Sequence, residues 1–116
     1  MQANEIKAFV PSKDYDESRR FYKAWGFAVE AINNDLSVVS SGKCSFFLQR
    51  FYNEELAKNL MLQLSVQNIE QAQESIGNIK EFTVKQSPIQ NEPWGKVIYL
   101  WGPSGELWHI TEYNNE

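Results

Sequence analysis

The only histidine of the chain, His109, lies in the closing stretch "GPSGELWHITEY", Gly102 to Tyr113. An imidazole can ligate a metal ion or act as a general base near neutral pH. The stretch predicts a tight turn followed by a strand, which would hold the ring on one face of a sheet. Two readings of His109 are therefore open: a metal ligand of an enzyme, or one wall of a pocket without a metal.

Other residue types offer little further catalytic machinery. Cys44 is the only cysteine, so the chain has no internal disulfide and no cysteine-rich metal site. A lone thiol fits a reducing compartment. The sequence contains no glycine-rich phosphate loop and no spacing typical of a Ser-His-Asp triad. A general base would have to be His109 itself.

The amino-acid composition limits the classes of protein to which the chain can belong. With 116 residues, 42% hydrophobic and 22% charged, the chain predicts one globular domain. Aromatic residues make up 14%, and four of them are tryptophan, which favours an aromatic-lined cleft. The net charge of −4 argues against a nucleic-acid surface and permits a cationic ligand. We find no signal peptide and no apolar run of the roughly 20 residues that a membrane span needs, so we expect a cytoplasmic protein.

The first half predicts a strand, a helix and three strands. Ile6, Ala8 and Val10 alternate with other residues as in a short strand. Asp14, with Glu17 three residues later, is typical of a helix start, and Gly26 of a helix end. Strands are then expected over 27–31, 36–39 and 44–51, separated by the turns "NND" and "SSGK".

The second half repeats this plan. A strand is expected over 60–66, a helix capped by Asn68, and strands over 81–85, 96–101 and 107–113, with "QSPIQNEP" as a loop. The letters agree, because "SGKCSFFLQ" parallels "SGELWHITE" 63 residues later. We therefore predict a single α+β domain over 1–116. It consists of two βαβββ modules, about 5–51 and about 60–114, joined by a connector over 52–59, and they form a curved mixed sheet with a central cup.

Both ends of the chain resemble the glyoxalase / bleomycin-resistance / extradiol-dioxygenase superfamily, also called vicinal-oxygen-chelate proteins. The opening "KAFVPSKDYDESRRFYKAWGF" has the aspartate, serine, "FY" and "GF" of that superfamily at Asp14, Ser18, Phe21-Tyr22 and Gly26-Phe27. The closing "YLWGPSGELWHITEY" resembles its last hairpin, usually "DP.GN" followed by a strand. The resemblance covers nearly the whole chain and implies the same two-module fold.

The resemblance also places the metal positions of the superfamily's enzymes. They fall on Lys7, Phe46 to within one residue of register, Met61 and His109, with Gln63 as the alternative to Met61. An ammonium group repels a dication, phenylalanine has no donor atom, and a thioether is a poor ligand for hard ions. One imidazole, even with Gln63, falls short of the three or four ligands that a divalent ion needs. We therefore predict no metal and no other cofactor.

Without a metal, the sequence is most similar to the bleomycin-resistance branch. This implies an acidic homodimer that sequesters a bulky, aromatic, cationic antibiotic in two clefts at its interface, with the N-terminal strand open to exchange between subunits. Alternatives are a metal-dependent glyoxalase-like lyase or dioxygenase, a metal-free isomerase or hydrolase with His109 as base, and a regulator that binds another protein. Enzymatic activity thus stays open, with binding the favoured reading.

Strand alternation predicts which side chains line the cup. The candidate ligand-binding residues are Phe9, Phe46, Met61, Gln63, Trp94, Tyr99, Trp101 and His109. They form a mostly apolar and aromatic surface suited to stacking on flat rings. A cationic tail could add cation–π contacts with Trp94 or Trp101, and Glu30, Asp35 and Glu92 could attract it.

Overall fold

The computed structural model describes residues 1–114, which form two mixed β-sheets and three helices. The first sheet has the order β1-β4-β3-β2 and comprises β1 (Phe9–Pro11), β2 (Ala28–Asn33), β3 (Leu36–Ser41) and β4 (Cys44–Gln49). The second has the order β5-β9-β8-β6, with β7 also paired to β8, and comprises β5 (Met61–Ser65), β6 (Lys85–Gln86), β7 (Gln90–Glu92), β8 (Gly95–Trp101) and β9 (Leu107–Tyr113). The helices are α1 (Tyr15–Trp25), α2 (Glu54–Asn59) and α3 (Ile69–Gly77).

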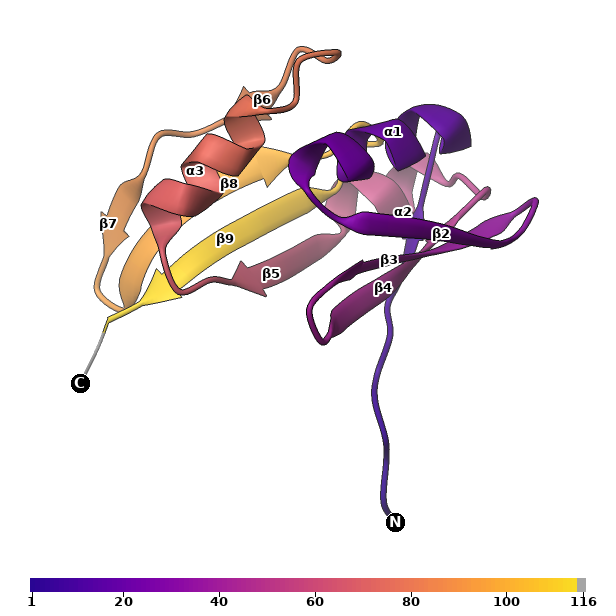
Figure 1. Cartoon of the computed structure of the whole chain (residues 1–116), viewed down its shortest axis with the longest axis horizontal. Coiled ribbons are helices and arrows are strands. Elements are labelled where there is room, and N and C mark those ends of the chain that lie inside the picture. Colours follow the sequence, from indigo (N-terminus) through magenta and orange to yellow (C-terminus); the bar gives the residue numbers. More distant parts are fainter. Residues whose placement is uncertain (115–116) are drawn as a thin grey trace.

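The two sheets share one plan, so the predicted α+β class with two βαβββ-like modules is confirmed. In each sheet the first strand pairs in parallel with the last, β1 with β4 and β5 with β9, and the other pairs are antiparallel. Helices α1 and α3 lie on the same side of the molecule, each against its own sheet (Figure 1). The opposite side of each sheet, which we call its open face, carries neither of these helices. No helix within residues 1–114 has the length and apolar character needed to cross a membrane.

Side-chain caps start both long helices where the sequence predicts them. The Asp14 carboxylate accepts a hydrogen bond from the backbone N–H of Glu17 at 3.0 Å, and the Asn68 side chain accepts one from Gln71 at 3.0 Å. Helix α1 ends at Gly26, whose φ of 122° is rarely adopted by residues with a side chain. The predicted boundaries of α1 are therefore confirmed.

We expect Asp14→Ala to lower the free energy of unfolding by about 1 kcal/mol, because an orphan N–H of the first turn loses its acceptor. Asp14→Ser, which keeps an acceptor at this position, should lose less. Urea denaturation followed by circular dichroism measures both. Equal stability of the alanine variant and the parent protein would contradict the capping role.

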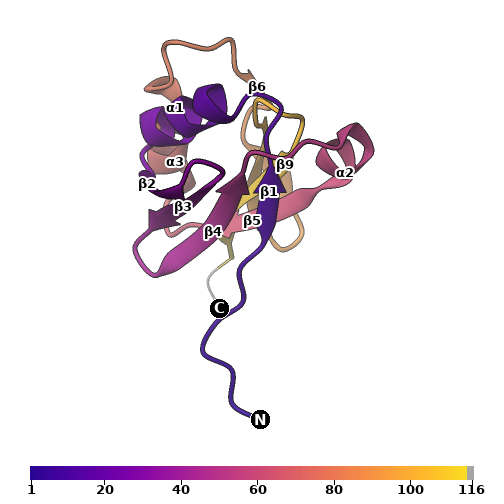
Figure 2. The same cartoon turned by 90° about the vertical axis from the view of Figure 1, so that its right-hand side faces the viewer.

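Two strands differ most from the sequence prediction. Strand β1 begins at Phe9 rather than Ile6, and the N-terminal end of the chain projects away from the body (Figure 2). The strand expected over 81–85 is replaced by β6 at Lys85–Gln86 and, inside the expected loop, by β7. Pro88 lies between these two short strands, and since proline has no N–H to donate, the ladder along β8 is interrupted there. Ser87 closes the gap by bonding to the backbone of Tyr99.

The hydrophobic core is shared between the modules. Trp108 of β9 is 3% exposed, and its ring lies 5.5 Å from that of Trp25 and 5.3 Å from that of Phe46, centroid to centroid. Tyr22 and Phe27 complete this aromatic cluster under α1. Because Trp108 comes from the second module and the others from the first, the cluster joins the two halves.

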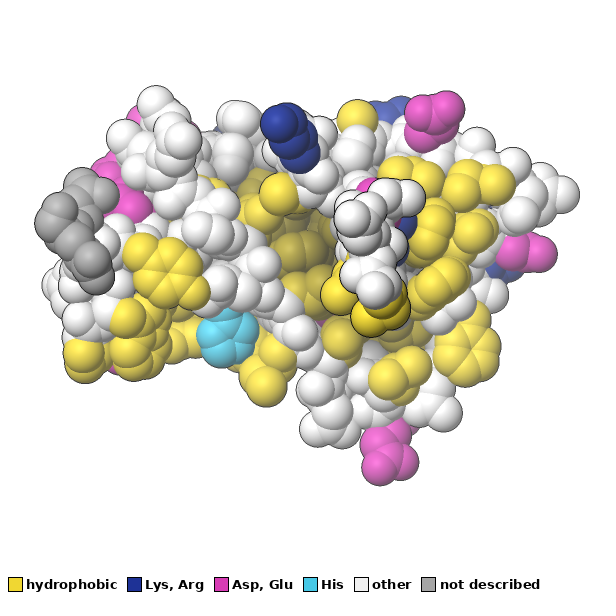
Figure 3. Space-filling model, turned by 90° about the horizontal axis from the view of Figure 1, so that it is seen from below, with side chains coloured by type: hydrophobic (Ala, Val, Ile, Leu, Met, Phe, Trp, Pro, Cys, Tyr) yellow, Lys and Arg dark blue, Asp and Glu magenta, His cyan; other side chains and the backbone are white. Residues whose placement is uncertain are grey.

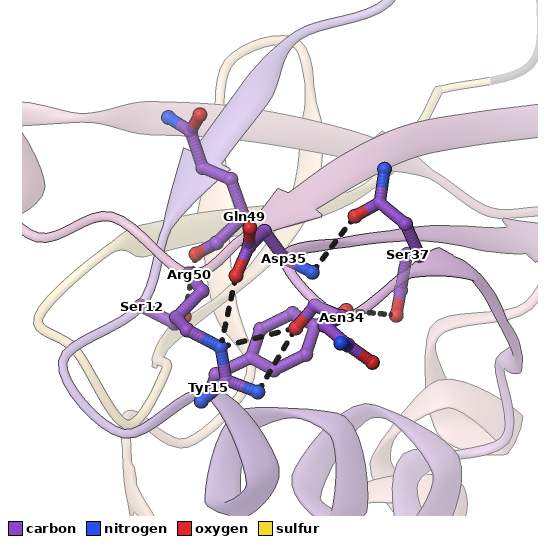
Figure 4. A network of polar contacts seen from close by, with 8 residues as sticks. Ser12, Tyr15, Asn34, Asp35, Ser37, Gln49 and Arg50 are labelled. Atoms are coloured by element: carbon purple, nitrogen blue, oxygen red, sulfur yellow. Dashed lines mark hydrogen bonds and ion pairs between the residues drawn. The ribbon is translucent and has the colours of Figure 1, made fainter.

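A polar network fixes the start of α1 to the end of the first sheet (Figure 4). The Tyr15 hydroxyl lies 2.5 Å from that of Ser37, and Ser12 donates to the Gln49 carbonyl at 2.6 Å. The Arg50 guanidinium lies over the Tyr15 ring, 4.5 Å from its centroid, and donates to the Asn34 carbonyl. These contacts position the β2–β3 turn and leave the open face of the first sheet to other side chains.

Candidate functional site

The open face of the second sheet gathers five of the predicted site residues in adjacent rows. Residues paired across strands share a face, so the register defines these rows. One row is Met61, Leu107 and Trp101, and the next is Gln63, His109 and Tyr99. The other face packs against the core and carries Leu62, Leu64, Trp108 and Ile110. The alternation predicted for β5, β8 and β9 therefore places these side chains as expected.

The central row contains the polar groups of this face. Tyr113 donates its hydroxyl hydrogen to the Gln63 side-chain oxygen at 2.8 Å. The rings of Tyr99 and His109 meet edge to face, with centroids 5.0 Å apart. The His109 Nε2 atom is buried and has no hydrogen-bond partner among residues 1–114. A ligand on this face would thus meet an amide, two phenols and an imidazole within an aromatic surface.

Trp94 and Trp101 lie at opposite ends of β8. Trp101 ends β8 and is half-buried, and the Lys85 ammonium lies over its ring, 4.5 Å from the centroid. Trp94 precedes β8, is 50% exposed, and its carbonyl accepts a hydrogen bond from the Asn114 N–H at 3.0 Å. Between them, β8 spans about 20 Å at the usual rise of a strand.

The first sheet also has an apolar open face, built differently from the prediction. Phe9 is 53% exposed, and its ring lies 4.8 Å from that of Phe47, its partner in register. Lys7 lies over the same Phe47 ring and forms an ion pair with Glu5. Phe46, which the sequence analysis places on the cup side, is 5% exposed and faces the core. The open face of the first sheet therefore carries Phe47 where the sequence analysis expected Phe46, a difference of one residue of register.

Seen from the side opposite α1 and α3, apolar side chains cover much of both halves, and the surface is hollowed between them (Figure 3). This groove has a volume of about 410 Å³. Its walls come from β4 and β5 and from the N-terminal segment, and Phe27, Phe46 and Trp108 contribute to its lining. Phe46 therefore borders the groove although it belongs to the core.

The structure thus brings Met61, Gln63, Tyr99, Trp101 and His109 together on one sheet and places Phe9 on the other and Trp94 at the sheet's far end. Four further residues of these faces were not predicted as site residues: Phe47, Lys85, Leu107 and Tyr113. Period-two alternation within β9 could have identified Leu107 and Tyr113. Lys85 could not be identified in this way, because its position on the face follows from the pairing of β6 with β8.

The residues at the superfamily's metal positions do not fit a divalent ion. Lys7 carries a positive charge, Phe46 and Phe47 have no donor atom, and Met61 offers only a thioether. His109 and Gln63 lie side by side, but the Gln63 oxygen already accepts the Tyr113 hydrogen bond. Within residues 1–114, no three side chains of histidine, cysteine, aspartate or glutamate cluster as a metal site would require.

A buried carboxyl group lies under the closing turn. Glu106 is fully buried and accepts hydrogen bonds from the Tyr22 hydroxyl at 2.6 Å and the Ser104 N–H at 2.9 Å. Trp108 in turn donates its indole N–H to the Tyr22 oxygen at 3.0 Å. Burial raises the pKa of the Glu106 carboxyl, and burial together with the nearby carboxylate raises the pKa of Tyr22 well above its usual range. This group holds the second module's last hairpin to α1.

Solved structures with the same architecture include antibiotic-binding proteins. A bleomycin resistance determinant encoded on the transposon Tn5 aligns with a TM-score of 0.81 at 15% identity, covering 97% of this chain and 100% of that chain. A bleomycin-binding protein complexed with bleomycin gives 0.79 at 16% identity, with 97% and 100% covered. An antibiotic binding protein from Streptomyces sp. CB03234 gives 0.79 at 19% identity, with 98% and 99% covered.

These alignments show that the chain has the glyoxalase/bleomycin-resistance fold over nearly its whole length. The structural resemblance predicted from the two ends of the chain is thereby confirmed at the level of the fold. The sequence matches no protein-family model, and no curated protein sequence is significantly similar to it.

Proposed function

We propose that this protein binds and sequesters a bulky aromatic small molecule of the antibiotic type, without breaking a bond in it. The observation that carries the proposal is the open face of the second sheet. There Met61, Tyr99 and Trp101 surround the polar pair Gln63 and His109. Aromatic and thioether side chains adapt to flat rings, and a few polar groups orient them. Three solved structures of this fold are described as bleomycin-resistance, bleomycin-binding or antibiotic-binding proteins, which supports the same role here.

We further propose that two copies form the binding clefts, the first sheet of one protomer facing the second sheet of the other. Large apolar side chains stand exposed on both open faces, among them Phe9 at 53% and Met61 at 64%. Contiguous exposed apolar surface of this kind usually marks an interface or a ligand site. A twofold dimer would create two equal clefts. The N-terminal end of the chain projects from the body (Figure 2), and we propose that this segment is the one exchanged between protomers.

The first test is calorimetric titration of chelator-treated protein with bleomycin, metal-free and then copper-loaded, after metal analysis of the untreated protein. We expect saturable binding of about one drug molecule per protomer. Trp101→Ala should weaken binding about tenfold or more, as for the loss of a central aromatic contact. Leu56→Ala, which removes an exposed apolar side chain on α2, is the control and should bind like the parent protein.

Each result decides between readings. If Trp101→Ala binds bleomycin as tightly as the parent protein, the ligand site does not lie on this face. If the titration releases or absorbs no heat, bleomycin is not the ligand. One firmly bound metal ion per chain in the untreated protein would favour the metal-dependent lyase or dioxygenase. Sedimentation at twice the chain mass of 13.5 kDa would support the dimer, whereas a monomer that binds the drug fully would contradict the shared clefts.

A further inference from the structure

The Trp101 ring on the second sheet's open face already carries a cation of its own. Lys85 is the register partner of Trp101, and its ammonium lies 4.5 Å from the ring centroid. Within residues 1–114, Lys85 forms no ion pair with a carboxylate. A positive charge over an aromatic face occupies the position that a ligand cation would take, and it repels a second cation nearby. The Trp101 end therefore disfavours cationic groups and attracts anionic ones.

The other end of the same face has the opposite character. Glu92 of β7 pairs with Gly95, at the start of β8, whose other neighbour in the sheet is Tyr113. Within the described chain, Glu92 forms no ion pair, and the cation–π contacts leave the Trp94 ring without a cation. An uncompensated carboxylate at this end of the face attracts a positive charge. The face is thus positive at one end of β8 and negative at the other, about 20 Å away.

Other charges near these ends do not cancel the difference. Glu17 of α1 contributes with Lys85 to the lining of a cavity of about 480 Å³ beside Trp101, but it does not reach ion-pair distance from the ammonium. On the first sheet, Lys7 repeats the lysine-over-ring arrangement on Phe47, but Glu5 compensates its charge. Lys85 is therefore the residue whose charge can discriminate between anionic and cationic ligand groups.

We infer that Lys85 determines ligand orientation: an aromatic ligand lies along β8 with its anionic group at Trp101 and any cationic group at the Glu92 end. This inference rests on the proposed function, because it concerns the same open face. It adds the charge pattern of the ligand class, which is bipolar rather than simply cationic, and it excludes Trp101 as the cation subsite.

Three probes with one ring system and different charge test the inference: 2-naphthoate, 2-naphthamide and 2-naphthylmethylammonium. The indole N–H signals of the four tryptophans in a proton–nitrogen NMR spectrum report where each probe binds. Trp94 and Trp101 report the two ends, and the buried Trp25 and Trp108 serve as internal controls. The variants are Lys85→Gln and, as a matched loss of charge in the exposed β3–β4 turn, Lys43→Gln.

We expect naphthoate to shift the Trp101 signal and to bind there about fivefold more tightly than the ammonium probe, as an exposed ion pair allows. The ammonium probe should shift the Trp94 signal instead. Lys85→Gln should abolish the preference at Trp101, and Lys43→Gln should keep it. An ammonium probe that binds at Trp101 as tightly as naphthoate, or a preference that survives in Lys85→Gln, would overturn this inference alone. If even the neutral amide shifts neither the Trp94 nor the Trp101 signal, the open face is no aromatic site, and the proposed function fails with it.

Discussion

Trp108→Ala is expected to lower the free energy of unfolding by about 3–5 kcal/mol, the usual cost of truncating a buried tryptophan. The side chain is 3% exposed, and its ring packs against Tyr22, Trp25 and Phe46 from the other module. The Tyr22 oxygen also loses the indole N–H that donates a hydrogen bond to it. Since small domains are stable by about 5–15 kcal/mol, this loss is a large part of the total.

Urea denaturation followed by far-ultraviolet circular dichroism measures the effect without relying on tryptophan fluorescence. Trp94→Ala is the matched control, because Trp94 is 50% exposed and accepts the Asn114 hydrogen bond with its backbone carbonyl, which the substitution keeps. That variant should change stability by about 0.5 kcal/mol or less. Both variants must be compared at one protein concentration, since the stability of the proposed dimer would depend on it. Equal losses in the two variants would show that the modules do not depend on a shared aromatic core.

Much of the second sheet could be predicted from the sequence because its strands alternate cleanly. In β5 and β9, apolar core residues such as Leu62 and Ile110 alternate with Gln63 and His109, so one face follows from the other. The first sheet offered no such pattern near "CSFF", where two phenylalanines are adjacent. A shift of one residue exchanges the faces, and only the structure shows that Phe47 rather than Phe46 lies on the open side.

The charge pattern of the site was harder to predict than its apolar character. Lys85 reaches Trp101 only because it lies in β6, a strand of two residues. This strand follows a loop, and Pro88 comes two residues after its end. Local propensity is weak over so short a segment, and pairing with β8 decides its conformation. Trp101 was therefore predicted as a ring open to a ligand cation, whereas the fold supplies a cation from the chain itself.

The closing turn also departs from the pattern of the superfamily that it resembles, in a way that only packing explains. Where the superfamily usually has "DP.GN", this chain has "GPSGE", with glycine in place of the aspartate and glutamate in place of the asparagine. A Cβ atom on Gly102 would lie 2.4–2.7 Å from the carboxyl atoms of Glu106. The Glu106 carboxylate therefore fills the space that a side chain at position 102 would need. We infer that the two replacements compensate for each other.

Substitution of Glu106 should lower the free energy of unfolding by a large amount, and the contribution of this side chain should depend on pH. Glu106→Ala leaves the Tyr22 hydroxyl and the Ser104 N–H buried without an acceptor, which should cost about 2–5 kcal/mol. Glu106→Gln keeps the shape and one acceptor oxygen and should cost less. Burial raises the pKa of Glu106 in the folded chain, so folding favours its protonated form. Its contribution to stability is then fully present below the unfolded pKa of about 4.3 and declines as the pH rises through the folded value.

The difference between the parent protein and Glu106→Gln isolates this contribution, because all other carboxylates are common to both. Urea midpoints at several pH values from 4 to 7 should show the parent protein's advantage over Glu106→Gln to be largest at pH 4 and to shrink toward pH 7. Parallel pH profiles would mean that the buried carboxyl does not resist ionisation. An advantage that grows with pH would mean that the carboxylate is stabilised, with the donors Tyr22 and Ser104 outweighing burial. The same carboxyl would then hold the closing hairpin to α1 as an anion.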